Sequence, residues 1–465
     1  MKEILIRYDK RFEDFFNELQ ACQTLVRMVF CIWGELRLIG IWLLEEELQR
    51  RALEPEQWPN CEYCGKKLHS KGLRARKILT LFGSITWKRR IGRCPGGCKG
   101  AHIAPMDNRL GLDKGQRTSA EVKWLGCTLV IFVPYQLAAV ILQQMTGLDL
   151  SADTLWRWTQ AVGQTLFAQT QKELASLEDG TVIPEEALSD ELAKVPMMVG
   201  ADGVMVPFRP KAGSPAGKTV WREVKVAIIA RLMQRTTRTN KTVTVLKQRR
   251  LVAFLGSIKQ FMPFLKLELL KQGLLHAVRV VWVSDGGTGY WGVFKKVLQP
   301  FFKVTGILDF YHAAQNLYKA AQVWLDGRTV ACRTWFESRR HRLRHGEEAK
   351  VLTELEELLQ SKQLSDSAKG AIQNIYHYLQ QHENHIHYQQ FKEDGLPIGS
   401  GVVESACKWL IQQRFKGVGM RWSEDGFNRL LYVRVSWVNQ RLGAGRKKAN
   451  YCLIDAQRVI NAGIV

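Results

Sequence analysis

The chain contains 465 residues, which at about 100–200 residues per domain allows two to four structural units. Apolar residues make up 46% of the sequence, which argues against a disordered protein. Lys and Arg number 67 against 44 Asp and Glu, giving a formal charge of +23. An excess this large favours a nucleic-acid partner, because neutralising phosphates releases counterions. The excess is spread along the chain, which indicates basic surfaces on folded domains rather than a basic tail.

The sequence predicts neither secretion nor membrane insertion. The N-terminal run MKEILIRYDKRFEDFF is charged and lacks the apolar core of a secretion signal. Residues 125–142 are apolar, but Pro134 lies at their middle, so we expect two helices joined at Val133-Pro134. We therefore expect a soluble, cytoplasmic protein whose ten cysteines are thiols or metal ligands.

The N-terminal region, residues 1–54, shows helical periodicity. Apolar side chains recur there at three- and four-residue steps, namely Phe12, Phe15, Phe16, Leu19, Leu25 and Val26. We interpret this face as ordinary core.

Two short-spaced cysteine pairs follow in residues 55–112. Cys61 and Cys64 precede a strand-like region with a turn at Gly83-Ser84, and Cys94 and Cys98 follow it. Two such pairs joined by a hairpin suit tetrahedral Zn²⁺ ligation by thiolates and predict a structural zinc ribbon. Unrelated buried thiols are the alternative. The module is also basic, and we expect DNA contacts from Lys88, Arg89 and Arg90.

Residues 113–176 are predicted to be helical. Ser151 can cap a helix beginning at Ala152, after a short turn from the preceding helix. This pattern is typical of a helix-turn-helix, whose second helix would present Thr154, Arg157 and Gln160 to DNA. A plain helical hairpin fits the pattern equally well.

An acidic linker, residues 177–194, separates these modules from an α/β pattern. Strands are expected at 194–208, 219–233, 241–248, 277–287 and 302–312, with a helix over 251–275. Strands followed by alternating helix and strand predict a mixed α/β sheet. We divide the rest of the chain into a core at 195–325, a helical insertion at 326–394, a helical region at 395–440 and a tail at 441–465.

Three carboxylates have contexts suited to catalysis. Asp202 and Asp285 each follow apolar strand residues and precede glycine, and Glu404 begins a late helix. Carboxylates brought together repel one another unless cations neutralise them, and Mg²⁺ or Mn²⁺ prefers oxygen ligands. A pair of such ions serves phosphodiester chemistry. Any one of these residues alone would be read as a turn or a helix-terminal acid.

The sequence resembles the DDE transposases of the bacterial Kra-type insertion sequences, within the Mutator-like superfamily. The residues that carry the likeness are Cys61-Glu-Tyr-Cys64, Asp202-Gly203, Trp221-Arg-Glu-Val-Lys225, Ser284-Asp285-Gly286, Asp309-Phe-Tyr-His312, Pro397-Ile-Gly-Ser-Gly-Val-Val-Glu404 and Gly417-Val-Gly-Met-Arg-Trp-Ser423. The resemblance implies a bacterial, nucleoid-associated enzyme with an RNase H-like catalytic domain and a helical insertion. It also implies two-metal cleavage at element ends of double-stranded DNA, joining of the freed 3′-hydroxyl to target DNA, and a homodimer or larger assembly.

The resemblance also bears on the neighbours of the three acids. Asp309 rivals Asp285 for the second position, but RNase H-like topology places the first and fourth strands together, which favours Asp285. Asp309 and His312 then support the site, and so does Lys408. The remaining expected DNA contacts are Arg339, Arg340, Arg414, Lys416 and Arg421. Core packing is the default for Trp409 and Trp422.

Two other functional classes remain open on the sequence. An RNase H-like structure-specific nuclease would use the same metal chemistry without needing the upstream modules. A catalytically silent, transposase-derived DNA-binding protein would keep the acids without activity.

Overall fold

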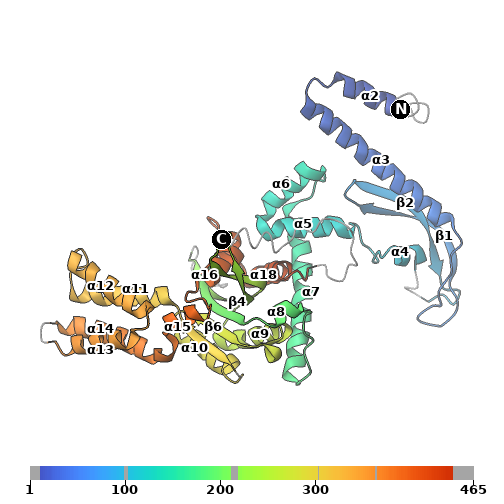
Figure 1. Ribbon diagram of the computed structural model, residues 1–465. Helices are drawn as coiled ribbons and strands as arrows, with labels where there is room; N and C mark the ends of the chain where they lie inside the picture. Colours follow the sequence, from blue (N-terminus) through green and yellow to red (C-terminus); the bar gives the residue numbers. More distant parts are fainter. Residues whose placement is uncertain (1–10, 99–102, 211–217, 302, 362–363, 443–465) are drawn as a thin grey trace. The chain divides into compact units, whose positions relative to one another are not determined.

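The computed structural model describes residues 11–98, 103–210, 218–301, 303–361 and 364–442 (Figure 1). The chain divides into two compact units, Met1–Trp158 and Thr159–Val465. Both combine helices with strands, so the protein is a multidomain α/β protein. None of the helices in the described part of the chain has the length and apolar character needed to span a bilayer.

The first unit combines a long helix, a β-hairpin and a group of shorter helices. Its elements are α2 (Arg11–Ala21), α3 (Leu25–Leu53), β1 (His69–Leu79), β2 (Ser84–Arg93), α4 (Pro105–Arg109), α5 (Ala120–Phe132), α6 (Tyr135–Thr146) and the start of α7 (Ala152–Glu178). β1 and β2 pair antiparallel, as predicted for the ribbon. The C-terminal part of α3 packs on this hairpin through a small core that contains Ala52, Ile78, Ile85 and Trp87.

Two helix predictions in this unit are confirmed. The apolar stretch forms α5 and α6, separated at Val133-Pro134. Proline has no backbone N–H to donate, so a helix cannot continue through it without losing a hydrogen bond. Gly147, in the left-handed conformation, ends α6, and the Ser151 hydroxyl accepts a hydrogen bond from the Thr154 N–H at the start of α7. α7 runs on to Glu178, so it is longer than a single recognition helix requires.

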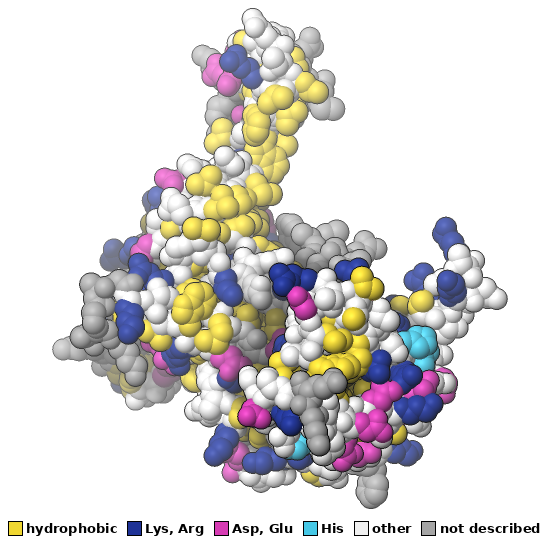
Figure 2. Space-filling model, turned by 90° about the vertical axis from the view of Figure 1, so that its left-hand side faces the viewer, with side chains coloured by type: hydrophobic (Ala, Val, Ile, Leu, Met, Phe, Trp, Pro, Cys, Tyr) yellow, Lys and Arg dark blue, Asp and Glu magenta, His cyan; other side chains and the backbone are white. Residues whose placement is uncertain are grey.

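The N-terminal helices do not form the core that their apolar periodicity suggested. In α3 only Ala52 is buried, while Leu25 is 75% exposed and Val26 64% exposed. The apolar side chains at the start of α3 have few packing partners, because only the C-terminal part of this helix packs against the hairpin in the first unit. Figure 2 shows apolar side chains gathered along this helical arm.

The second unit is built on a mixed five-stranded sheet of order β5-β4-β3-β6-β7. The strands are β3 (Met197–Phe208), β4 (Val220–Thr236), β5 (Thr242–Leu255), β6 (Val280–Ser284) and β7 (Val304–Leu308). β3, β4 and β5 pair antiparallel, and β6 and β7 run parallel to β3. The two parallel strands are short and almost fully buried, as expected for strands covered on both faces.

Helices fill the connections and the insertion. They are α8 (Asp190–Ala193), α9 (Ile258–Lys271), η1 (Leu274–His276), α10 (Thr288–Val293), the π-helical η2 (Phe294–Leu298), α11 (Phe310–Trp324), α12 (Val330–Arg344), α13 (Glu348–Leu359), α14 (Asp366–Gln381), η3 (Glu383–His385), α15 (Tyr388–Glu393), α16 (Gly401–Cys407), the π-helical η4 (Lys408–Gln412), α17 (Gln413–Phe415) and α18 (Glu424–Val438). The predicted insertion is therefore helical, and one apolar core runs from the sheet into it.

The boundary between β5 and α9 differs from the sequence-based expectation. Residues 251–255 extend β5 instead of starting a helix, because β4 continues alongside them and pairs Val224 with Leu255. α9 begins only after Ser257, whose side chain forms a capping box with Gln260. The acidic linker contacts the sheet, since the Glu186 carboxylate pairs with Arg250 of β5 at 2.8 Å.

Candidate active site

Asp202 and Asp285 lie at the same level on neighbouring strands. Gly200 of β3 pairs with Val283 of β6. Asp202 and Asp285 each lie two residues after their member of this pair. Asp202 lies within β3 and not at its end, because β4 continues beside it and pairs Asp202 with Val226. Asp285 does leave β6, and its carboxylate accepts a hydrogen bond from the Gly287 N–H at 3.2 Å. The register thus brings both side chains to the carboxyl edge of the two parallel strands.

α16 brings Glu404 to the same edge. The helix packs on β3 and β4, and a Cβ at Gly200 would overlap the Val403 side chain. The absence of a side chain at Gly200 therefore lets the helix lie against the strand one residue before Glu404. The Glu404 side chain remains 45% exposed, and Lys408 lies one turn further on with its Nζ 3.8 Å from Glu404 Oε2.

The three carboxylates act on one another electrostatically. Burial raises the pKa of Asp202, and the charges of Asp285 and Glu404 raise it further. In the described part of the chain, the carboxylate oxygens of these three acids do not all lie within 4.8 Å of one another. The site is thus an open arrangement of oxygen donors whose mutual repulsion a cation would relieve.

Asp309 has a different environment. It is 1% exposed and caps α11, where its Oδ1 accepts hydrogen bonds from the Tyr311 and His312 N–H groups at 2.6 and 3.0 Å. Its Oδ2 accepts bonds from the N–H and the hydroxyl of Ser400. Burial alone would raise the pKa of Asp309, but the bonds from His312 and Ser400 lower it to about 2. Both oxygens are therefore committed to holding α11 against the segment that leads into α16.

His312 links Asp309 to the open acids. Its Nδ1 lies 3.6 Å from Asp309 Oδ2, and the interaction with Asp309 raises the pKa of His312. The charges of Asp285 and Glu404 act in the same direction. The neighbouring carboxylates therefore favour the protonated form of this imidazole.

Sequence reasoning missed three residues at the rim. A Cβ at Gly203 would overlap the Glu223 carboxylate, which also accepts bonds from Tyr290 at 3.1 Å and Lys225 at 2.6 Å. The ring of Tyr378, from the insertion, packs on Gly286 beside Asp285. Glu223 left a signal, since it belongs to the Trp221-Arg-Glu-Val-Lys225 motif at the start of β4. Tyr290 and Tyr378 left none because their positions depend on tertiary packing.

The four predicted zinc ligands do come together. Cys61, Cys64, Cys94 and Cys98 place their sulfurs within 4.8 Å of one another, with Cys64 and Cys94 3.3 Å apart. The Gly96 N–H donates to Cys94 Sγ at 3.2 Å, a bond that favours the thiolate. Four sulfurs around one point, at the base of the β1–β2 hairpin, can bind zinc.

The predicted DNA contacts separate into exposed and buried residues. Lys88, Lys416 and Arg421 are exposed, whereas Arg90 is half-buried. Arg157 is exposed and pairs with Asp153 at 2.8 Å. In the insertion, Arg339 pairs with Glu354 at 2.8 Å and Arg340 pairs with Glu337 at 3.0 Å.

Three of the predicted DNA contacts are buried and are therefore corrected. Arg89 is 7% exposed, bonds to Asp107 at 3.0 Å and donates to the carbonyl of Arg74, so it stabilises the hairpin. Arg414 is 2% exposed, and its guanidinium lies 5.4 Å from the Trp422 ring centre. Gln160, offered to a DNA groove by the sequence, is also buried. Trp409 is buried as expected for a core residue.

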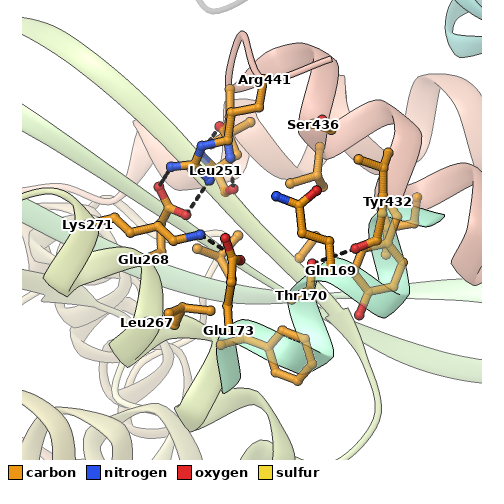
Figure 3. Close-up of a pocket in the computed structure, with 17 residues that line it drawn as sticks. Gln169, Thr170, Glu173, Leu251, Leu267, Glu268, Lys271, Tyr432, Ser436 and Arg441 are labelled. Carbon is orange, nitrogen blue, oxygen red and sulfur yellow. Dashed lines mark hydrogen bonds and ion pairs between the residues drawn. The ribbon is translucent and has the colours of Figure 1, made fainter. Parts of the chain in front are cut away.

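A cavity of about 140 Å³ lies elsewhere in the second unit (Figure 3). It is lined by residues of α7, β5, α9 and α18 and contains acids that are already paired. Lys271 binds Glu173 at 2.8 Å, and Arg441 binds Glu268 at 2.7 Å. These ion pairs join α9 to α7 and to the residues that follow α18. None of the three candidate catalytic acids lines this cavity.

Comparisons with known proteins give distant matches. No family model matches the chain. It is 22% identical over 372 residues to the "UPF0236 protein in vanSb 3'region" of Streptococcus gallolyticus, which covers 79% of this chain and 73% of that protein. Among solved structures, the Drosophila P element transposase strand transfer complex matches with a TM-score of 0.32 and 10% identity, over 71% of this chain and 94% of that chain. The chain is thus distantly similar to the Streptococcus protein, and the structural similarity is too low to carry an argument.

Proposed function

We propose that the chain is a DDE transposase in which Asp202, Asp285 and Glu404 form the catalytic site. The observation that carries the proposal is their convergence: three partly exposed acids from β3, the end of β6 and α16 meet at one edge of the sheet and interact electrostatically. No Arg or Lys neutralises Asp202 or Asp285 through an ion pair among the described residues. Such a site suits divalent cations, and a formal charge of +23 suits a DNA substrate.

The sheet topology supports an RNase H-like catalytic domain. Three antiparallel strands, then two strands parallel to the first, in the order β5-β4-β3-β6-β7, agree with that proposal. The helical insertion between β7 and α16 agrees with it as well. Assignment to the Kra-type, Mutator-like group rests on the sequence motifs around Asp202, Asp285 and Glu404.

The bonding of Asp309 favours Asp285 as the second catalytic acid. Asp309 is buried and commits both oxygens to Tyr311, His312 and Ser400, whereas Asp285 is half-exposed. We therefore assign Asp309 and His312 to positioning α16, and Lys408 to an ion pair with Glu404.

The three acids offer only oxygen donors, which fit Mg²⁺ or Mn²⁺. When bound, two such ions supply activation of the attacking oxygen and stabilisation of the leaving one. The acids would hold the ions, and the imidazole of His312 would offset part of the remaining negative charge. By this proposal the enzyme cleaves at element ends and joins the freed 3′-hydroxyl to target DNA.

DNA binding is assigned to the flanking modules. We propose that the zinc ribbon at 55–112 and the helix-turn-helix at 113–176 recognise the DNA ends of the element. The catalytic core consists of 195–325 and 395–440, and the helical insertion at 326–394 lies between these two parts. The exposed Lys88, Arg157, Lys416 and Arg421 are the phosphate contacts. Two ends must be held together before joining, so at least two copies should act.

The test uses the intact protein with labelled DNA carrying the element's own ends, in Mg²⁺ and in Mn²⁺. We expect cleavage and strand joining, and a loss on the order of 10³-fold or more in Asp285→Asn and Glu404→Gln. Glu356→Gln, an exposed carboxylate in α13, is the matched control and should keep full activity.

Other outcomes point to other functions. Cleavage of RNA–DNA hybrids without processing of the ends would favour a structure-specific nuclease. Specific binding of the ends without cleavage in either metal would indicate a catalytically silent DNA-binding protein. Activity that survives Asp285→Asn would refute the catalytic assignment.

A further inference from the structure

The first unit carries a large apolar surface on α3. Between Leu25 and Leu43, eleven large apolar side chains are 36–75% exposed: Leu25, Val26, Met28, Val29, Phe30, Ile32, Trp33, Leu36, Leu38, Trp42 and Leu43. We call this set the N-terminal apolar surface. It follows the arm on which Figure 2 shows apolar side chains concentrated.

This surface is too large to be an ordinary exposed patch. With each side chain 36–75% exposed, it offers on the order of 1,000 Å² of apolar area, taking roughly 100–200 Å² for a fully exposed side chain across this mixture of aliphatic and aromatic residues. A patch on a monomer rarely exceeds a few hundred Å², whereas a standard-size interface buries about 800 Å² on each partner. The area of α3 therefore matches what a stable interface between two proteins needs.

The chemistry of α3 excludes two kinds of occupant. A helix that is apolar around its circumference is normally buried in a protein or in a bilayer, but α3 is not apolar enough to cross a membrane. Residues 25–44 carry only Arg27, Glu35 and Arg37 as charges. This surface is nearly neutral, so it lacks the cations that binding to DNA or to an acidic membrane surface would require. An apolar surface of a protein is the partner that fits it best.

The position of α3 favours a second copy of this chain. From Arg37 onward α3 contacts the hairpin, with Gly40 against the Phe82 ring and Arg37 Nε donating to the Phe82 carbonyl at 3.1 Å. Eight of the eleven exposed side chains lie before Arg37, on the part of α3 that precedes these contacts. In a two-fold pair each copy presents the same surface, and the near-zero charge of the segment does not oppose self-association.

We propose that the N-terminal apolar surface pairs with the same surface of a second copy, making the chain a homodimer through α3. The pair also fixes two β1–β2 hairpins at a set separation. The inference rests on the exposed surface and its charge, so it does not depend on the proposed transposase activity, and either can fail without the other.

The test measures the mass of the intact protein in solution by light scattering and sedimentation, from nanomolar to micromolar concentrations and without DNA. We expect twice the chain mass of 53.2 kDa. The variant Val29→Glu/Trp33→Glu places charges on one face, one helical turn apart, at residues that are 54% and 49% exposed in a single copy. It should weaken dimerisation by at least a hundredfold and leave the helix content unchanged.

Two controls make the result specific. Asn17→Glu/Gln20→Glu adds the same charges at exposed polar positions of α2 and should remain dimeric. Mixing Val29→Glu/Trp33→Glu with Val29→Lys/Trp33→Lys should restore a mixed dimer, because opposite charges then meet. A wild-type protein that is monomeric at micromolar concentration, or a Glu variant that stays dimeric, would overturn the proposal. So would recovery of a wild-type monomer bound to neutral lipid vesicles.

Discussion

Asp309 Oδ2 accepts a hydrogen bond from the backbone N–H of Ser400 at 2.6 Å, across 91 residues of sequence. The same carboxylate caps α11 through Tyr311 and His312. One buried acid therefore joins the helix after β7 to the segment that begins α16, and α16 carries Glu404. The geometry of the candidate site depends on this bond, although Asp309 itself has no free oxygen to offer.

Asp309→Asn and Asp285→Asn are expected to fail in different ways. Replacing Asp309 removes a buried, charge-assisted acceptor and a helix cap, which should cost on the order of 2–4 kcal/mol of stability. Replacing the half-exposed Asp285 should change stability by less than about 1 kcal/mol while it removes activity. Thermal and denaturant unfolding of the two variants measures this difference. Equal destabilisation by both would contradict the separation of roles.

Zinc should be required by the first unit and not by the second. Cys94→Ser removes a buried ligand of the four-sulfur group, so we expect loss of bound zinc and local unfolding of the β1–β2 hairpin. Metal analysis with hydrogen exchange resolved by segment measures both effects. Cys22→Ser, just after α2, is the matched control and should retain the metal. A wild-type protein that contains no zinc after purification without chelators would refute the assignment.

The second unit should lose stability on acidification through His382. Burial, and then the charges of His385 and Lys295, lower the pKa of His382 to about 4, and its ring packs against Trp291. Since the folded pKa lies below the unfolded value of about 6.5, the neutral ring stabilises the fold above that pH, and this contribution is lost as pH falls toward 4. The loss amounts to roughly 3 kcal/mol at most.

Chemical unfolding at pH 7 and pH 4.5 checks this contribution. His382→Gln should unfold more easily than the wild type at pH 7 but depend less steeply on pH. If the unfolding free energy of the variant depended on pH as strongly as that of the wild type, His382 would not be the cause of the loss of stability on acidification. His276, which is exposed and pairs with Glu185, offers the control substitution His276→Gln.

Exposed and buried cations should differ in their effects on DNA binding. Lys416→Ala/Arg421→Ala should weaken binding at all sequences and reduce the salt dependence of log K by about 1 for each phosphate that the variant no longer neutralises. Arg414→Ala should instead destabilise the second unit, because its guanidinium is buried against Trp422. Binding titrations at several salt concentrations, together with thermal unfolding, separate the two effects. Salt dependence that is unchanged in the Lys416 and Arg421 variant would exclude those residues from the interface.

Features that depend on local pattern could be predicted from the amino-acid sequence. Cys61, Cys64, Cys94 and Cys98 were recognisable because thiolate ligation requires short spacing on either side of a hairpin. The order of strands and helices in the second unit followed from hydrophobic period and glycine positions, and so did the contexts of Asp202, Asp285 and Glu404.

Contacts between residues far apart in sequence could not be predicted, because they depend on how the whole chain packs. Asp285 and Asp309 have similar local contexts, and the bond from Ser400 is what commits one of them to the core. Arg89 and Arg414 have the same chemistry as the exposed cations, but each lies among buried partners. The apolar face of α3 looks like core in the sequence, since periodicity reports that a face is apolar and not what covers it. Burial depends on the packing of the whole chain, and for α3 we infer that it depends on a second chain as well.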